Sequence, residues 1–96
     1  YVLAVCSIPE ESWVRADGKP YSNVDAAIVM DHIILAATAL GLGTCWIGAF
    51  DPQAAREAFH LDEKMEPVVL TPLGYPAETR INRKKKPVGD LVTFID

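Results

Sequence analysis

The stretch from Val24 to about Leu40 constrains the fold most, because it predicts a helix that is apolar on almost every side. Isoleucines, leucines and five alanines cover most of its circumference. Its few polar residues are Asp25, Asp31, His32 and Thr38. Such a helix has to be covered on nearly all sides, and the rest of a 96-residue chain is too small to do so. We therefore expect a subunit interface or further partner structure around it.

A membrane-spanning helix is the alternative for this stretch on hydrophobicity alone. Asp31 and His32 lie near its middle and the run is short, which disfavours that alternative. Half of the chain is apolar and 23% is charged, an ordinary balance for a soluble globular protein. The net charge of −4 argues against a general nucleic-acid-binding protein.

Strand and helix signals alternate along the chain and predict an α+β fold with helices packed on a sheet. Predicted strands or apolar stretches run from Tyr1 to Ser7, from Thr44 to Phe50 and from Pro67 to Tyr75. The segment from Pro9 to Pro20 is polar and predicts a turn or loop. Because the chain opens inside a predicted strand, the sequence suggests a fragment or the mature part of something longer.

Capping signals mark the ends of both predicted helices. Ser22 or Asn23 can cap the long helix, and Gly41 or Gly43 is predicted to end it. Asp51 is predicted to cap a second helix that has Pro52 at its first position and continues to Ala58 or Phe59.

The cysteines and histidines do not predict a catalytic or metal centre. Cys6 and Cys45 each lie in an apolar run, where two buried free thiols are expected rather than a disulfide. A catalytic thiol at Cys45 would need a cationic or helix N-terminal setting, and no partner is identifiable, so a packed, inert thiol is favoured. His32, alone on an apolar helix, is expected to be an interface or core residue. No residue spacing indicates a metal site.

The segment from Gly41 to Phe50 is the first candidate for binding chemistry. Glycine lacks a Cβ, so the backbone at Gly48 can approach a flat ligand and donate its N–H to that ligand. The structural alternative is a helix C-cap at Gly41 or Gly43 and a tight turn at Gly48. The glycine spacing does not match a dinucleotide-binding fingerprint, and these glycines follow a helix rather than a strand.

The basic cluster Arg83-Lys84-Lys85-Lys86 is the second candidate. Grouped Arg and Lys side chains can hold a phosphate monoester, which carries about −1.5 to −2 charges. The structural alternative is a solvated loop with surface charges. A nuclear-localisation signal or a nucleic-acid-binding segment is a third possibility, which the acidic remainder of the chain disfavours.

Taken in order, these segments resemble the nitroreductase family. The helix part of the match comprises Asp25-Ala26-Ala27-Ile28, Leu35-Ala36-Ala37 and the run from Leu40 to Gly48, which is similar to a "GLGT-x-W-I-G" turn. The strand part comprises Pro67 to Leu70 and Leu73-Gly74-Tyr75-Pro76. The basic part comprises Arg83 to Pro87, followed by Asp90-Leu91-Val92. The pieces have the family's order and spacing from Asp25 onward.

The resemblance implies a cytoplasmic α+β homodimer with FMN bound at the dimer interface. Such proteins pass hydride from NAD(P)H through flavin N5 to nitroaromatics, quinones or related small acceptors, and the flavin supplies the chemistry. By position, Ile47, Gly48 and Ala49 would lie along the flavin ring, with a backbone N–H near N5. Arg83 and Lys85 match basic positions that reach the FMN phosphate. The resemblance assigns no catalytic side chain to this chain.

The match covers only the second half of the family's fold. Residues 1–96 are therefore expected to form the C-terminal portion of a single domain, completed by a missing N-terminal half or by a homodimer partner. The Arg-Ser-x-Arg-type segment, with which the family's first half holds FMN, has no counterpart here. Gly48 stands where the family frequently has a glutamate, which leaves the acceptor open. The alternative is a non-catalytic fragment or interaction half-domain that has lost flavin binding.

Overall fold

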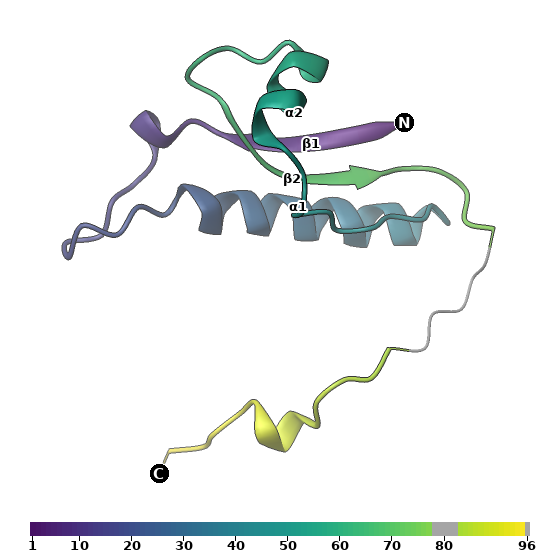
Figure 1. The fold of residues 1–96 in the computed structure, drawn as a ribbon. Helices are drawn as coiled ribbons and strands as arrows, with labels where there is room; N and C mark the ends of the chain where they lie inside the picture. The colour runs from purple at the N-terminus through teal and green to yellow at the C-terminus, as the bar shows by residue number, and fades with distance from the viewer. Residues whose placement is uncertain (78–82, 96) are drawn as a thin grey trace.

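The chain forms two helices and a pair of strands. A computed structural model describes residues 1–77 and 83–95. The strands are β1 (Val2–Ser7) and β2 (Glu66–Pro72), and the helices are α1 (Ser22–Ala39) and α2 (Pro52–Phe59), with short 3-10 helices η1 (Pro9–Glu11) and η2 (Val88–Asp90). The strands pair antiparallel, with α1 on one face of the pair and α2 on the other (Figure 1). The predicted α+β class, with helices packed on a mixed or antiparallel sheet, is confirmed, and the strand pair is antiparallel.

Strand β2 pairs with β1 along one edge and forms an isolated bridge with Ile47 along the other. Its partner β1 pairs regularly up to Val5, opposite Val69, and then the register shifts so that Cys6 lies opposite Pro67. Since Pro67 has no N–H for the ladder, a bulge at this point is expected. The predicted third strand at Thr44–Phe50 is only partly right, because this segment contacts β2 through isolated bridges and forms no continuous strand.

The end of α1 follows the prediction and its start does not. Gly41 has a φ of +77°, the Leu42 N–H donates to the Ala37 carbonyl at 2.9 Å, and the Gly41 N–H donates to the Thr38 carbonyl at 3.0 Å. This is the Schellman arrangement that glycine favours. Prediction of Ser22 or Asn23 as the capping residue was wrong. The N-cap is Tyr21, without a side-chain cap, and Ser22 is already buried in the first turn.

A small hairpin explains where α1 begins. The Tyr21 N–H donates to the Trp13 carbonyl at 3.0 Å, and the two aromatic rings meet edge to face with their centroids 4.9 Å apart. Arg15 binds the Asp17 carboxylate through two hydrogen bonds, of 2.9 and 2.6 Å, and Gly18 takes a φ of +89° in the turn. Part of the predicted loop is therefore ordered, and it positions Tyr21 directly before the helix.

The second helix begins as predicted. The Asp51 carboxylate accepts a hydrogen bond from the Gln53 N–H at 3.0 Å, and Pro52 occupies the first helical position. Such a cap satisfies one of the free N–H groups of the first turn. The helix ends at His60, whose backbone is left-handed with a φ of 53°.

The hydrophobic core lies between α1 and the strands and is small. Met30 and Val69 are fully buried, and Val5 and Ala26 pack with them. On its other side α1 exposes large apolar side chains beside Asp31 and His32, since Ile28 is 52% exposed and Leu35 is 61% exposed. The expectation that the rest of the chain leaves this helix partly uncovered is confirmed. Nowhere in residues 1–77 and 83–95 is a helix long and apolar enough to cross a membrane.

Candidate functional site

The segment from Gly43 to Ile47 runs along the edge of β2 that β1 leaves open. At one end, the Gly43 N–H donates to the Gly74 carbonyl at 2.7 Å, and the Gly74 N–H donates back at 3.4 Å. At the other end, the Ile47 N–H donates to the Leu70 carbonyl at 2.9 Å, and the Leu70 N–H donates back at 3.0 Å. Both are reciprocal pairs of an antiparallel ladder. They fix the backbone immediately before Gly48.

Thr71 holds the middle of the same segment through its side chain. Its Oγ1 accepts a hydrogen bond from the Cys45 N–H at 2.9 Å and donates to the Pro72 carbonyl at 2.8 Å. The side chain is fully buried. Sequence analysis did not identify Thr71. The available signal was a threonine two residues after Val69, and hence on the same face of the strand, followed by a proline that cannot donate to a ladder.

Gly41, Gly43 and Gly48 differ in whether the fold itself favours glycine at their positions. A Cβ added to Gly43 would lie 3.1 Å from the Cβ of Pro76, a tight contact that Pro76 would have to relieve by shifting slightly. Gly41 needs glycine for its positive φ. At Gly48, by contrast, φ is not in the left-handed region and an added Cβ would have no atom within 4 Å. Neither backbone geometry nor packing within the described residues therefore requires glycine at position 48.

The backbone beyond Ile47 is open and has free donors. Gly48 and Ala49 are exposed. Their N–H groups have no hydrogen-bond partner among residues 1–77 and 83–95. From Gly43 to Phe50 the sequence has no charged side chain. The turn Ile47–Ala49 thus combines an apolar surface with two free N–H donors, which fits the edge of a flat heteroaromatic ring such as the flavin of FMN.

The two thiols are less buried than predicted. Cys45 is exposed and Cys6 is half-buried, and both are free. Cys45 lies outside the core because its backbone follows an open sheet edge, and its Sγ lies 3.9 Å from the neighbouring Trp46 carbonyl. Burial raises the pKa of the Cys6 thiol, an effect that the charge of Arg56 partly opposes. Neither thiol has the setting of an activated nucleophile. His32 is also exposed and is not a core residue of this chain.

A groove of about 310 Å³ lies where β1 ends and α1 begins. Cys6, Ser7, Glu11, Ser22 and Asp25 are among the residues that line it. The Ser7 Oγ is buried and has no hydrogen-bond partner in the described part of the chain. Nothing in this groove matches the residues that sequence analysis singled out for flavin binding.

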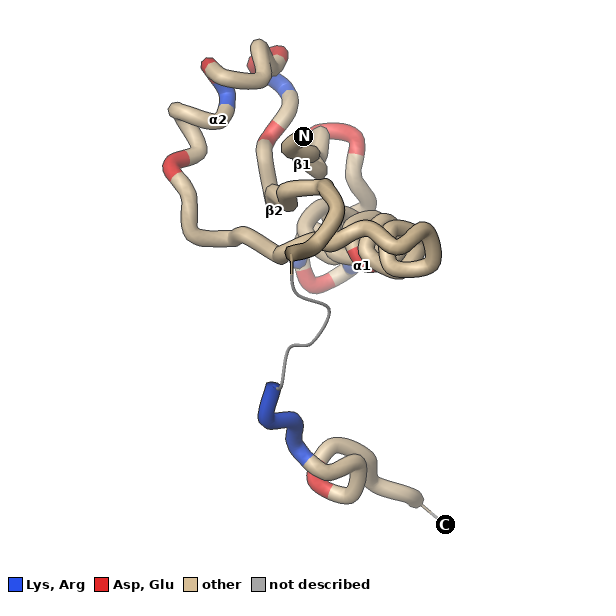
Figure 2. Tube along the Cα trace, turned by 90° about the vertical axis from the view of Figure 1, so that its right-hand side faces the viewer, with Lys and Arg blue, Asp and Glu red and all other residues tan. Residues whose placement is uncertain are grey.

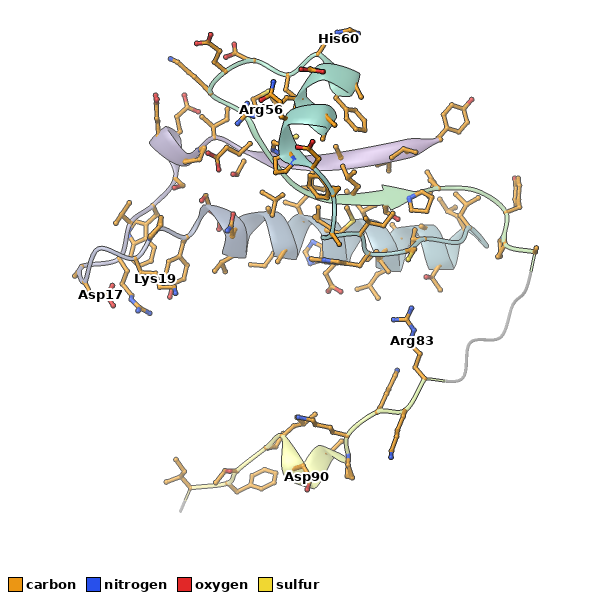
Figure 3. The ribbon with its side chains drawn as sticks, viewed as in Figure 1. Asp17, Lys19, Arg56, His60, Arg83 and Asp90 are labelled. Carbon is orange, nitrogen blue, oxygen red and sulfur yellow. The ribbon has the colours of Figure 1, made fainter. Side chains whose placement is uncertain are left out.

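The basic cluster lies on a separate segment. Residues 83–86 are exposed, and the segment 83–95 lies apart from the helices and strands in both views (Figures 1 and 2). Its backbone hydrogen bonds join Asp90, Leu91 and Val92 to Pro87 and Val88 of the same segment. Figure 3 places Arg83 on this segment, away from the sheet. The structure therefore does not bring Arg83 and Lys85 next to Ile47–Ala49, and their common role in one site stays a prediction.

Comparison with known proteins identifies relatives of one kind. The model of the "Nitroreductase family" matches residues 10–75. A proposed NADH dehydrogenase/NAD(P)H nitroreductase of Methanothermobacter thermautotrophicus is 40% identical over 58 residues, which cover 56% of this chain and 30% of that protein.

Solved structures show the same likeness. A nitroreductase family protein from Clostridium difficile superimposes with a TM-score of 0.81 and 33% identity, covering 97% of this chain and 58% of its own. A proposed NAD(P)H:FMN oxidoreductase from Staphylococcus epidermidis gives a TM-score of 0.68 and 25% identity, covering 77% of this chain and 35% of its own. The chain thus spans less than two thirds of the length of each of these relatives.

Proposed function

The chain belongs to the nitroreductase family, and from that premise we propose that residues 1–96 are the C-terminal portion of one FMN-dependent oxidoreductase domain. The complete domain would transfer hydride from NAD(P)H to a nitroaromatic, quinone or related small acceptor. The names of the relatives support NAD(P)H as the donor, and the name of the Staphylococcus epidermidis protein supports FMN. When bound, the flavin would supply hydride acceptance and donation at its N5 atom.

The open backbone at Gly48 is the observation that carries this proposal. Gly48 and Ala49 present free N–H groups in a segment, residues 43–50, that has no charged side chain, and no atom of the described residues lies within 4 Å of a Cβ added to Gly48. A flat ring can approach such a backbone to hydrogen-bonding distance, whereas a Cβ would keep it away. In the proposed site, Ile47, Gly48 and Ala49 lie along the flavin ring and orient it.

Arg83 and Lys85 are proposed to hold the FMN phosphate. Both side chains are exposed and belong to a run of four cations, which suits a group with about two negative charges. Because their segment lies apart from the turn Ile47–Ala49, completion of the site requires structure that this chain does not supply. A further half of the domain or a second subunit would provide it.

The uncovered face of α1 supports the same conclusion about assembly. Ile28 and Leu35 are more than half exposed on this face. Large apolar side chains on a helix are usually buried against another element. We propose that the N-terminal half of the domain, a homodimer partner, or both cover it.

Flavin content tests the proposal directly. The complete protein, meaning residues 1–96 together with the half or subunit that completes the domain and called the full chain below, should stay yellow after gel filtration has removed unbound FMN. It should also oxidise NAD(P)H in the presence of a nitroaromatic or quinone. Heat-released cofactor should be FMN by chromatography. A folded, colourless protein that neither takes up FMN nor oxidises NAD(P)H would exclude the proposal and favour a non-catalytic fragment.

A further inference from the structure

The Thr71 hydroxyl bridges the one residue pair between segment 43–47 and β2 that does not form its direct backbone hydrogen bond. The reciprocal pairs Gly43–Gly74 and Ile47–Leu70 set an antiparallel register in which Cys45 lies opposite Pro72. In a regular ladder every second residue pair exchanges two hydrogen bonds. Pro72 has no N–H, so this pair could form only one bond, from the Cys45 N–H to the Pro72 carbonyl.

That one bond is not made directly. The Cys45 N–H donates to the Thr71 Oγ1 at 2.9 Å, and the same hydroxyl donates to the Pro72 carbonyl at 2.8 Å. One hydroxyl therefore joins the donor and the acceptor that a regular pair would join. A hydroxyl both donates and accepts, which makes threonine suited to this place, and valine of similar shape can do neither.

This relay is the principal restraint on the middle of the segment. Cys45 is exposed and Trp46 is 48% exposed, so their side chains are packed only in part. Thr71 is fully buried, so water cannot readily replace its hydroxyl. The Cys45 N–H is part-buried in this hydrogen bond, so losing its acceptor is costly unless the chain moves to satisfy it. The simplest movement brings Cys45 toward the Pro72 carbonyl, which would tilt the turn that follows Ile47.

We propose that Thr71 is a positioning residue for the turn Ile47–Ala49, acting through Cys45 and without touching the cofactor. This role in flavin chemistry rests on the proposed function. The placement of the Gly48 and Ala49 N–H groups depends on the path of the backbone before them, and a shift of about 1 Å in a reacting geometry can cost on the order of a hundredfold in rate.

The test uses the full chain with FMN and three variants. Thr71→Val removes the hydroxyl at constant shape, Thr71→Ser keeps it, and Thr38→Val is the matched control, because the Thr38 hydroxyl donates only to the Ile34 carbonyl of its own helix. Thr71→Val should accelerate amide hydrogen exchange at Cys45 by about tenfold or more. It should also slow flavin reduction at saturating NAD(P)H by about tenfold or more. Thr71→Ser and Thr38→Val should stay within about threefold of wild type in both measurements.

Several results would overturn the inference. These are unchanged exchange or unchanged reduction in Thr71→Val, or an equal loss of reduction rate in Thr71→Val and Thr71→Ser. If Thr71→Val does not fold, the wild-type protein still decides, because a Cys45 amide that exchanges as fast as an open loop excludes the relay. If the wild-type chain binds no FMN, the proposed function fails, and the exchange comparison then decides on the relay alone.

Discussion

Ile47 and Leu70 exchange two backbone hydrogen bonds, of 2.9 and 3.0 Å, although 23 residues separate them in the sequence (70 − 47). This pair is the last point at which the segment beside β2 is tied to the sheet. The next residue, Gly48, is exposed and lacks a hydrogen-bond partner for its N–H within the described residues. The backbone of Ile47 is thus fixed by hydrogen bonds to β2, and the backbone of the next residue, Gly48, is accessible to a ligand.

Gly48→Val is expected to impair flavin chemistry and to spare stability. Its φ is outside the left-handed region and an added Cβ meets no atom within 4 Å, so the fold of this chain tolerates the side chain. A bound ring near the Gly48 backbone would be displaced, which should slow flavin reduction by NAD(P)H on the order of a hundredfold. Stopped-flow reduction and a melting curve on one preparation measure both effects. A stable variant with the wild-type reduction rate would place Gly48 away from the flavin.

Gly41→Ala serves as the reverse control for that experiment. Gly41 has a φ of +77°, where alanine costs about 1–2 kcal/mol of stability. Denaturant unfolding should show this loss, while the folded fraction should reduce its flavin at the normal rate. If Gly48→Val also lost stability while its folded fraction reduced flavin at the normal rate, both glycines would be needed only for backbone conformation.

Arg83→Ala with Lys85→Ala should weaken FMN binding in the full chain. Charge-assisted hydrogen bonds contribute roughly 1.5–3 kcal/mol each, and less where water screens them, so a loss of tenfold or more in affinity is expected. Lys84→Ala with Lys86→Ala is the matched control, since it removes the same net charge from the same exposed segment. Flavin fluorescence titration measures both. If both double variants weaken FMN binding equally, the cluster attracts the phosphate through its total positive charge, and the assignment of Arg83 and Lys85 is wrong.

Leu35→Glu tests whether other structure covers the open face of α1. Leu35 is 61% exposed in this chain, where a glutamate by itself would be well tolerated. If another half or subunit buries the position, an unpaired charge there is strongly destabilising, by several kcal/mol. Light scattering and thermal unfolding of the full chain should show dissociation or a lowered Tm, whereas Asn23→Glu at the start of the same helix should show neither. A Leu35 variant with unchanged mass and Tm would mean that the face stays open to solvent.

The hairpin before α1 should respond to acid at a lower pH than an ordinary carboxylate would predict. The hydrogen bonds from Arg15, and secondarily the one from the Lys19 N–H, hold the pKa of Asp17 below its ordinary value of 3.8. Because the folded pKa is lowered, this ion pair stabilises the hairpin above pH 3.8 and is lost as the pH falls through the folded value. The indole N–H resonance of Trp13 should therefore stay constant down to about pH 4 and move below it. Asp17→Asn should abolish that movement, and a Trp13 resonance that moves near pH 5 would contradict the assignment.

The sequence by itself determined the elements that depend on neighbouring residues. Asp51 and Pro52 predicted the start of α2, because a carboxylate two residues before a free N–H and a fixed proline φ act locally. Gly41 and Gly43 predicted the end of α1 for the same reason, and Gly41 adopts the positive φ that few other residues adopt. The ordered motifs from Asp25 onward also identified the family, which residues 10–75 match.

The tertiary structure alone decided how distant residues meet. The sequence does not distinguish the roles of Gly41, Gly43 and Gly48. In the structure, a Cβ at Gly43 would contact Pro76, whereas a Cβ at Gly48 would meet no atom within 4 Å. The start of α1 depended on a hairpin that ends at Tyr21, rather than on the capping residues beside it. Thr71 and Cys45 are 26 residues apart, and their hydrogen bond depends on the register between two chain segments. Local backbone preference does not specify that register, because it follows from the simultaneous packing of both segments.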